Sequence, residues 1–335
     1  MNEGVALEIA SHEQGSDLLP GIAHGPYLCP PDLLLRARKQ GPTVLAVAGA
    51  DAAHVLKSVN WAASFGLVEP ILVGDPAAIE KALQREGKGT LFRIVRAETE
   101  ADAARLAVGL VVSGEAGLLM KGHLHTDVLM RAAVGRTSGL RQPGVRLTHI
   151  FVMYWPGAPR PLIITDAALN VAPDHVTTEH IVRHAIVVAR AVGIHHPRIA
   201  MLSASETVSS SMPSSTAAAA FVTGFRAEAV ASGCSIAGPL AFDVAFSKEA
   251  AALKGMEHDA VAGRADIMVV PNIETGNTLF KALVYLKHAT AVGVVLGASV
   301  PIVLTSRADP IEARLASIAL AKLLSPSITC PAGDQ

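Results

Sequence analysis

The sequence predicts an α/β protein of two domains, each built on a mostly parallel, doubly wound sheet with helices on both faces. The chain has 335 residues, enough for about two domains of roughly 150 residues. Half of the residues are hydrophobic and 17% are charged, a composition typical of a compact globular protein. Short runs rich in Val, Ile or Leu alternate with helical patterns along the chain, and strands that alternate with helices form parallel βαβ units.

The alternation begins in the N-terminal third, where each apolar run ends in a Gly, Ser, Thr or Asp turn. The predicted strand–helix pairs are 43–50 with 51–66, 70–75 with 76–87, 91–97 with 98–115, and 117–122 with 127–135.

The rhythm changes at residues 141–165, and "THIFVMYWP", "GAPR" and "PLIITD" predict an antiparallel hairpin there. We place the entry to the second domain there. Alternation resumes with a helix at 177–193, a strand at 198–204 and a strand–helix pair at 267–288, and a closing unit follows at 301–324. The pattern leaves open which domain that closing unit joins.

Charge and targeting signals exclude several classes of function. The formal net charge is −1 with no long run of like charge, which argues against nucleic acid or an anionic membrane as a partner. The N-terminus lacks the basic start and apolar segment of a signal peptide, and the longest apolar run, 291–304, is too short to cross a bilayer. The cysteines at 29, 234 and 330 match no zinc or CxxC pattern, so we expect a soluble protein of the cytoplasm.

Polar residues that directly follow strands are the best candidates for a site, because ligands in open α/β sheets bind beyond the carboxyl ends of the strands. Five turns carry Gly, Ser, Thr, Asn, Lys or Arg, which can surround an anion with backbone N–H groups, hydroxyls and positive charge. Their candidate substrate-binding residues are Lys121, Gly122 and Thr126; Thr165, Asp166 and Asn170; Ser203 and Glu206; Glu274, Gly276 and Asn277; and Thr305, Ser306, Arg307 and Asp309.

Structural roles compete with binding at most of these turns. Thr126 or Asp127 could cap a helix, Asp166 and Asn170 could brace a long loop, and Gly276-Asn277 could make a turn. Arg307 is best explained by an anion, because a guanidinium binds phosphate oxygens in bidentate geometry.

The H-x-H-x-D array at His123, His125 and Asp127 also raises the possibility of a metal-dependent hydrolase. A metallo-β-lactamase motif would need a further histidine where this chain has Val128, and the array alternates on one face only if it is extended. Since Asp127 begins a predicted helix, the sequence favours an anion-binding turn over a metal site.

Several blocks in a fixed order resemble one protein family. They are "LMKGHLHTDVLM", "THIFVM", "PLIITDAALNVAPD", "GPLAFDVAFSKEAA", "KGMEHDAVAGRADIMVVP", "GNTLFKALVYL" and "PIVLTSRADPIEARLASIALA". From about residue 40 to about residue 322, the chain resembles the phosphate acetyl/butyryl transferases (phosphotransacetylase and phosphotransbutyrylase). The resemblance is strongest to the transferase part of the bifunctional enoyl-CoA hydratase/phosphate acetyltransferases.

The resemblance implies an isocitrate dehydrogenase-like architecture with the active site in a cleft between the domains. It assigns 1–147 and 299–335 to the first domain and 148–298 to the second, and it implies a homodimer. The implied reaction is reversible transfer of an acetyl or butyryl group between coenzyme A and phosphate, with neither a metal nor a bound cofactor.

By match to the family motifs, Ser306 and Arg307 would bind phosphate and the tetrahedral intermediate, and Gly122 and Thr126 would close the pocket. The base for the thiol would be Asp309 or Glu312, and we favour Asp309. Direct attack by the thiolate within a ternary complex needs no enzyme nucleophile.

The chain departs from the family pattern mainly in the second domain. The departures are His184, Ser205, Ala237, Val244, Arg264, Asn272, Thr275 and Thr278. They support one alternative, a catalytically weak or inactive relative that binds coenzyme A or acyl phosphate. A second alternative, independent of these departures, is a nicotinamide-linked dehydrogenase of the same architecture. Against the dehydrogenase, no GxGxxG follows the first strand.

Overall fold

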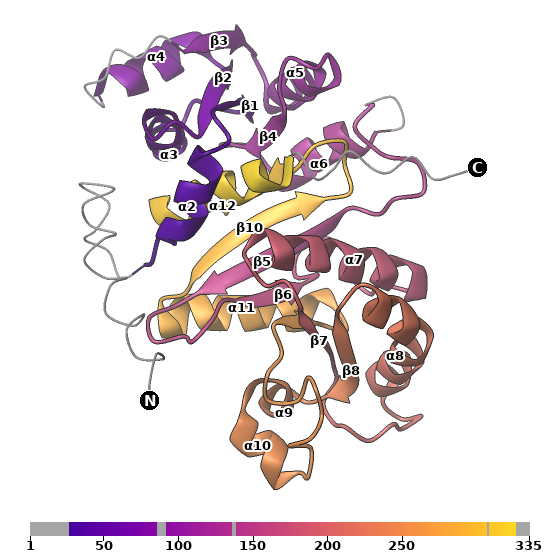
Figure 1. Ribbon diagram of the computed structural model, residues 1–335. Helices are drawn as coiled ribbons and strands as arrows, with labels where there is room; N and C mark the ends of the chain where they lie inside the picture. The colour runs from indigo at the N-terminus through magenta and orange to yellow at the C-terminus, as the bar shows by residue number, and fades with distance from the viewer. Residues whose placement is uncertain (1–26, 86–91, 136–138, 307, 326–335) are drawn as a thin grey trace.

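A computed structural model describes residues 27–85, 92–135, 139–306 and 308–325 of the chain (Figure 1). Its strands form one 11-stranded sheet in the order β3-β2-β1-β4-β11-β10-β5-β6-β9-β7-β8. The strands are β1 (Thr43–Ala48), β2 (Val68–Gly74), β3 (Arg93–Arg96), β4 (Leu118–Lys121), β5 (Thr148–Tyr154), β6 (Leu162–Thr165), β7 (Arg198–Leu202), β8 (Ser235–Leu240), β9 (Ile267–Val269), β10 (Thr290–Leu296) and β11 (Ile302–Val303).

Helices follow most of the strands, as the sequence predicts. The described helices are α2 (Pro31–Arg38), α3 (Ala53–Ser64), α4 (Pro76–Arg85), α5 (Glu100–Val112), α6 (Thr126–Val134), α7 (His175–Ala191), α8 (Pro213–Ala231), α9 (Phe242–Phe246), α10 (Lys248–Leu253), α11 (Ile273–Lys287) and α12 (Ile311–Leu324). Side chains of Thr99, Asp174 and Asn272 accept backbone N–H groups at the starts of α5, α7 and α11, which satisfies donors that a helix leaves unpaired. Among the described helices, none is long and apolar enough to cross a membrane.

The sheet is mostly parallel, and two antiparallel strands divide it. Strands β1 to β4 and β11 run in one direction, whereas β6, β9, β7 and β8 run in the other. Between them lie β10 and β5, which pair antiparallel with each other and with their outer neighbours. The predicted α/β class and the predicted hairpin, β5 with β6, are confirmed.

The closing unit lies against the N-terminal third of the chain. Strand β11 pairs with β4, and α12 packs on α2 and α3, so that the two ends of the described chain lie side by side in Figure 1. A single sheet passes through both predicted domains, and the domain boundaries stay a prediction.

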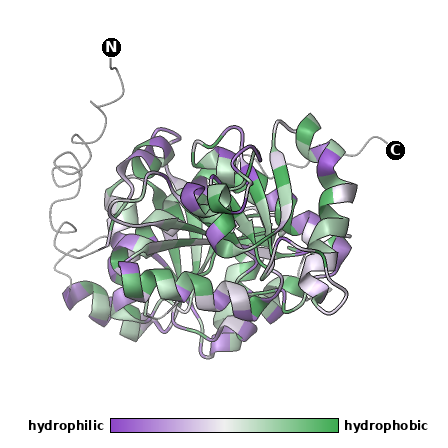
Figure 2. Ribbon diagram, turned by 90° about the horizontal axis from the view of Figure 1, so that it is seen from below, coloured by the Kyte–Doolittle hydropathy of each residue, from purple (hydrophilic) through white to green (hydrophobic). Residues whose placement is uncertain are grey.

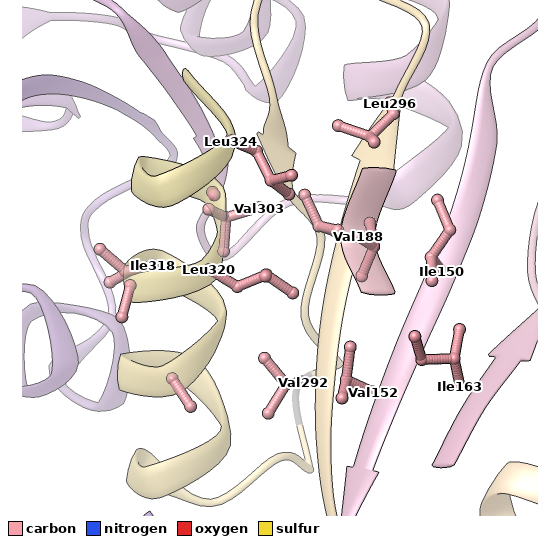
Figure 3. Packing of buried hydrophobic residues seen from close by; sticks show 14 of the residues in the cluster. Ile150, Val152, Ile163, Val188, Val292, Leu296, Val303, Ile318, Leu320 and Leu324 are labelled. Carbon is pink, nitrogen blue, oxygen red and sulfur yellow. The ribbon is translucent and has the colours of Figure 1, made fainter. Parts of the chain in front are cut away.

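One face of the sheet carries an unbroken apolar layer, which we call the continuous core. It receives side chains from strands in both halves of the sheet and from α2, α3, α4, α7, α8 and α12. Figure 3 shows its centre, where Leu320 of α12 points toward Val292 of β10, with Val152 and Ile163 beyond, and Ile318 projects from the other side of α12. Apolar strands enclosed by helices of mixed polarity are visible throughout the molecule (Figure 2).

The opposite face carries two separate apolar clusters. The N-terminal cluster includes Ala46, Val73, Leu119, Leu129, Val295, Ile302 and Leu304. The C-terminal cluster includes Phe151, Met153, Ile164, Ala200, Val244, Met268 and Ala291.

Strand β10 marks the division between the two clusters. Val292 and Val294 point into the continuous core. On the other face, Val295 belongs to the N-terminal cluster and Ala291 to the C-terminal cluster. Gly293 lies between them in the strand and contributes no side chain to either.

Candidate active site

Polar groups gather where the two clusters separate. A Cβ atom on Gly293 would lie 3.0 Å from His149 Nε2 and 3.3 Å from the carbonyl oxygen of Leu304. The glycine therefore leaves room for the chain after β11 to pass close to β10. We call His149, Asp166, Gly293 and residues 304–306 the polar seam.

The turn after β11 is held by hydrogen bonds within itself and to α12. The backbone N–H of Ser306 donates to Asp309 Oδ2 at 2.6 Å, and Ala308 N–H donates to Ser306 Oγ at 3.4 Å. Arg314 Nη2 donates to the Ser306 carbonyl at 3.0 Å. Ser306 is itself exposed, while Arg307 lies outside the described residues.

Asp309 is a carboxylate under opposing influences. Burial raises its pKa, and the hydrogen bond from Ser306 and the positive charges of Arg314 and Lys121 act in the opposite direction. Lys121 and Arg314 are both buried, so their charges are less screened than they would be at the surface. A partly buried carboxylate whose proton affinity is raised is suited to accept a proton.

Glu312 occupies a different environment, although it is only three residues further along. It is buried in the first turn of α12, and its carbonyl accepts from Cys29 Sγ at 3.9 Å. Burial, with a further contribution from the Glu312 charge, raises the pKa of Cys29 to about 12. Of the two candidate bases, Asp309 therefore lies with Ser306 and Lys121, and Glu312 lies beside Cys29.

The turn after β6 is built around Asp166. Its Oδ2 accepts from the backbone N–H of His149 at 2.9 Å and from Asn170 Nδ2 at 2.7 Å. Its Oδ1 accepts from the backbone N–H groups of Ala168 and Leu169 at 3.0 and 2.9 Å. The alternative that Asp166 braces its loop accounts for these bonds.

The neighbours of Asp166 show the same bracing pattern. Asn170 Nδ2 also donates to the carbonyl of Leu147 at 2.9 Å. The buried hydroxyl of Thr165 donates to the carbonyl of His149 at 3.1 Å. Substrate contacts at Thr165, Asp166 and Asn170 stay a prediction.

His149 is a polar residue of the seam that the sequence reasoning missed. It is 2% exposed, and among the described residues neither ring nitrogen has a hydrogen-bond partner. Burial lowers its pKa to about 4, while the charge of Asp166 acts in the opposite direction. At neutral pH the ring is therefore uncharged, with one N–H donor and one acceptor available.

The turn after β4 is fixed by close packing against β1. A Cβ atom on Gly122 would lie 2.2 Å from the carbonyl oxygen of Gly49, a distance that no other residue could accommodate without movement of the backbone. Gly122 N–H donates to Ala48 O at 2.8 Å, and Lys121 Nζ donates to Gly122 O at 3.3 Å. Lys121 is thereby positioned near Asp309 at the end of the neighbouring β11.

The histidines of the H-x-H-x-D array have other neighbours. His125 is the N-cap residue of α6, so neither Thr126 nor Asp127 is the cap. His125 Nδ1 lies 2.9 Å from Glu100 Oε2, and Asp127 Oδ2 accepts from Arg131 at 3.2 Å.

Two further observations bear on the β4 turn. His123 packs edge-on against His54, with ring centroids 6.0 Å apart. Within the described ranges, no group of three or more His, Cys, Asp or Glu side chains could hold a metal ion. Thr126 is exposed at the start of α6, and its role in closing a pocket stays a prediction.

The predicted turn at 274–277 is wrong, because α11 already includes these residues. Asn272 begins the helix by accepting Thr275 N–H at 2.9 Å, and an Asn cap of this kind is the sequence signal for that start. A Cβ atom on Gly276 would lie 2.8 Å from Ala167 Cα, and Asn277 Nδ2 donates to Ala167 O at 3.3 Å. These two residues thus fix α11 against the Asp166 loop.

Glu206, after β7, has structural partners. Its Oε1 accepts the backbone N–H of Ala241 at 3.1 Å, and its Oε2 pairs with Lys254 at 3.2 Å. These contacts fix the start of α9, and a substrate contact at Glu206 stays a prediction.

A groove lies beside the carboxyl ends of β7 and β9. A cavity of about 690 Å³ is lined by residues that include Glu274, Thr278 and Phe242, and a second cavity of about 470 Å³ adjoins it. The residues that line both cavities are Leu202, Ser214, Pro271 and Asn272.

Five of the departures from the family pattern occupy structural positions. Ala237 and Val244 are buried in the C-terminal cluster, and Asn272 caps α11. His184 Nδ1 lies 2.9 Å from Thr148 Oγ1, and Arg264 Nη2 donates to Glu257 O at 3.4 Å.

Sheet direction decides which of the predicted turns come together. The carboxyl ends of β4 and β11 point one way, and those of β6, β9 and β7 point the other, because β10 and β5 reverse the direction between them. The five turns therefore do not share one edge. Ser306, Asp309 and Lys121 form one group, and Asp166, Asn170 and Asn277 form another. The polar seam links the two groups.

Comparisons with known proteins agree with this fold. The model of a family described as phosphate acetyl/butaryl transferase matches residues 80–322. The chain is 45% identical over 293 residues to a phosphate acetyltransferase of Rhizobium meliloti, covering 87% of this chain and 92% of that protein. It is 40% identical to a probable phosphate butyryltransferase of Bacillus subtilis (strain 168), covering 89% and 98%. The crystal structure of a branched-chain phosphotransacylase from Enterococcus faecalis V583 is similar, with a TM-score of 0.72, 32% identity, and coverage of 84% and 99%.

Proposed function

Since the chain belongs to the phosphate acetyl/butyryl transferase family, we propose that it catalyses reversible transfer of a short acyl group between coenzyme A and phosphate. One observation of the structure carries the proposal furthest. The exposed Ser306 and the carboxylate of Asp309 share a turn, with the buried cations Lys121 and Arg314 beside it. This turn offers a hydroxyl and positive charge to phosphate and a base to a thiol.

In the proposed mechanism, the CoA thiol gives its proton to Asp309. The thiolate attacks the acyl carbon of the acyl phosphate and forms the C–S bond. The tetrahedral intermediate then breaks the C–O bond, and phosphate leaves. In the reverse direction, phosphate attacks the thioester carbon, and the departing thiolate takes the proton back from Asp309.

Charge near Ser306 supports this assignment. A developing oxyanion and a departing phosphate are both stabilised by positive charge in a site of low polarity. Arg307, whose part rests on the family resemblance, would bind phosphate together with Ser306. Acyl-CoA, CoA, acyl phosphate and phosphate are then substrates, and the mechanism uses neither a metal nor a bound cofactor.

A homodimer is part of the proposal. Tyr285 and Leu286 of α11 are 68% and 77% exposed, and they lie near the C-terminal end of a helix whose other apolar residues pack on the sheet. Exposed apolar side chains of this size are typical of an interface. A second copy of the chain is the partner we propose for this helix, and location in the cytoplasm stays a prediction.

The test is release of CoA from a panel of acyl-CoAs, from acetyl to hexanoyl, with and without phosphate and without added metal. We expect phosphate-dependent release, with the preferred chain length naming the acyl group. Arg307→Ala should lower the rate about 10²–10³-fold with the fold intact, and Arg131→Ala, which changes an exposed cation on α6, is the matched control.

Two outcomes would support the alternatives. No turnover, with CoA still raising the melting temperature, would indicate a binding protein. A rise in melting temperature with NAD, and no turnover of acyl-CoA, would indicate a dehydrogenase.

A further inference from the structure

Two buried or partly buried histidines are neighbours of Thr148, one on each face of the sheet, and their environments differ. His184, on α7, has a partner in the Thr148 hydroxyl at 2.9 Å. His149, the next residue in β5, points to the divided face, and its two ring nitrogens are buried with no hydrogen-bond partner in the part of the chain that the structure describes. The chain thus holds a paired and an unpaired imidazole of similar charge state close together.

An unpaired imidazole inside a protein is costly. Burying a polar group without a hydrogen bond destabilises the folded state, so an unsatisfied group in a native structure calls for an explanation. The backbone of His149 does not supply one, because its N–H and carbonyl are already used by Asp166 and Thr165. The imidazole, by contrast, contributes two polar atoms that no described residue pairs with.

The surroundings of His149 suit both the alkyl part and the carbonyl part of an acyl group. On one side, the ring packs on Phe151 at 4.3 Å between centroids, and Phe151 stacks on Phe280 at 4.2 Å. On the other side, His149 Nε2 approaches the chain that leads to Ser306, since Nε2 and the Leu304 carbonyl both lie within 3.3 Å of the point where a Gly293 Cβ would be. A polar donor is therefore flanked by an aromatic pair and by the proposed phosphate turn.

We propose that His149 is a specificity-determining residue that donates a hydrogen bond to the carbonyl oxygen of the acyl group, with the alkyl part against Phe151 and Phe280. This inference rests on the proposed function. A neutral donor suits a neutral thioester carbonyl, and the same bond strengthens as that oxygen gains charge in the tetrahedral intermediate. Because the ring is 2% exposed, the segment 304–306 must move away from it when the acyl group enters.

The test compares His149→Phe with His184→Phe. His149→Phe keeps an aromatic ring beside Phe151 and removes two unpaired nitrogens, so the melting temperature without ligand should stay the same or rise. Its kcat/KM for phosphate-dependent release of CoA from butyryl-CoA should fall about tenfold or more, and the KM for phosphate should not change. His184→Phe removes the partner of Thr148, so it should lower the melting temperature and leave kcat/KM per folded molecule near the wild-type value.

Further variants separate a hydrogen bond from packing. His149→Gln keeps a donor and should recover part of the lost kcat/KM, whereas His149→Leu should behave like His149→Phe. Wild-type rates in His149→Phe and His149→Leu would overturn the proposal. So would a fall in melting temperature without a change in kcat/KM, since that result would give His149 only a structural role.

Thermal shifts distinguish failure of this inference from failure of the proposed function. If the wild-type protein releases no CoA from any acyl-CoA, the proposed reaction is wrong. The extra rise in melting temperature with butyryl-CoA over free CoA then decides the role of His149. Loss of that difference in His149→Phe supports acyl binding, and its retention, or its absence in the wild type, contradicts it.

Discussion

The two faces of the sheet differ in whether their apolar layer joins or separates the two halves of the chain. On one face, a continuous core runs beneath strands of both halves and is closed by α12 and α7. On the other face, the apolar layer is split into two clusters at Gly293. The division of the molecule is therefore present on one face only.

This difference places stability and chemistry on opposite sides of the same strands. The continuous core joins the halves through β10 and β5. The gap between the clusters leaves space where polar groups such as His149 and Asp166 can lie without disrupting a hydrophobic layer. In β10 and β5, successive side chains point to opposite faces. The same two strands therefore contribute to the continuous core on one face and border the gap between the clusters on the other.

The largest effect should come from one of the two carboxylates at the start of α12, which have different neighbours. Asp309→Asn should lower acyl transfer about 10²–10⁴-fold, because the thiol loses its base. Its raised pKa also predicts that the wild-type rate increases with pH as Asp309 loses its proton. Glu312→Gln, the matched control beside Cys29, should keep most of the activity.

Rates measured from pH 4 to pH 8 give the comparison. If Glu312→Gln abolished activity and Asp309→Asn did not, the assignment of the base would be reversed. If neither variant changed the rate, no carboxylate of this turn would be the base.

A smaller effect, on stability and hydrogen exchange, should distinguish the continuous core from the two clusters on the other face. Leu320→Ala, in the continuous core, should lower the free energy of unfolding by about 3 kcal/mol, as for other buried leucines. It should also reduce hydrogen-exchange protection in both halves. Leu119→Ala, in the N-terminal cluster, should cost a similar amount but leave protection in β7 to β9 closer to that of the wild type. Equal loss of protection in the two variants would contradict the distinction between the faces.

The smallest effect should be the loss of folding stability at acid pH. One histidine on each face of the sheet contributes to it. The pKa values of His149 and His184 are lowered to about 4, while an unfolded histidine keeps the usual 6.5. The unfolded state therefore binds more protons between pH 6.5 and 4, so stability is complete above 6.5 and is lost as the pH falls through that window. For His149 the loss at pH 5 should be about 2 kcal/mol.

Urea unfolding at pH 7 and pH 5 measures this effect. His149→Phe should remove its share of the acid loss, and His184→Phe a smaller share because His184 is partly exposed. An unchanged pH dependence in His149→Phe would mean that His149 of the wild type binds protons equally in the folded and unfolded states, and that its pKa is not lowered by folding.

The sequence predicted local structure better than strand order. Alternating strands and helices gave the fold class, and the stretch between Thr148 and Asp166 gave the hairpin. Nothing in the pattern indicated that β11, from the end of the chain, would lie between β4 and β10. For that reason the pattern also could not show that the five turns lie at different edges, since β10 and β5 reverse the strand direction between β11 and β6.

The candidate site was predicted only in part. Ser306, Asp309 and Lys121 come together because β4 and β11 are adjacent and parallel, as a carboxyl-end rule requires. His149 was missed because it occupies an alternating position in an otherwise apolar strand, where a histidine is usually part of the core. Only the gap between the two clusters, which depends on packing, distinguishes it. The strand–helix pair at 267–288 matches α11, but Glu274 to Asn277 were also counted as a turn, although Asn272, a strong N-cap, begins the helix before them.

The position of β11 has a consequence for synthesis of the chain on the ribosome. The edge of β4 that β11 covers has no partner until residues 302–303 have been made, and α12, which closes the continuous core, follows directly after them. The first part of the protein to be made is therefore among the last to be completed. During translation its exposed strand edge and apolar surface must be kept from neighbouring chains for most of the time that the polypeptide is growing.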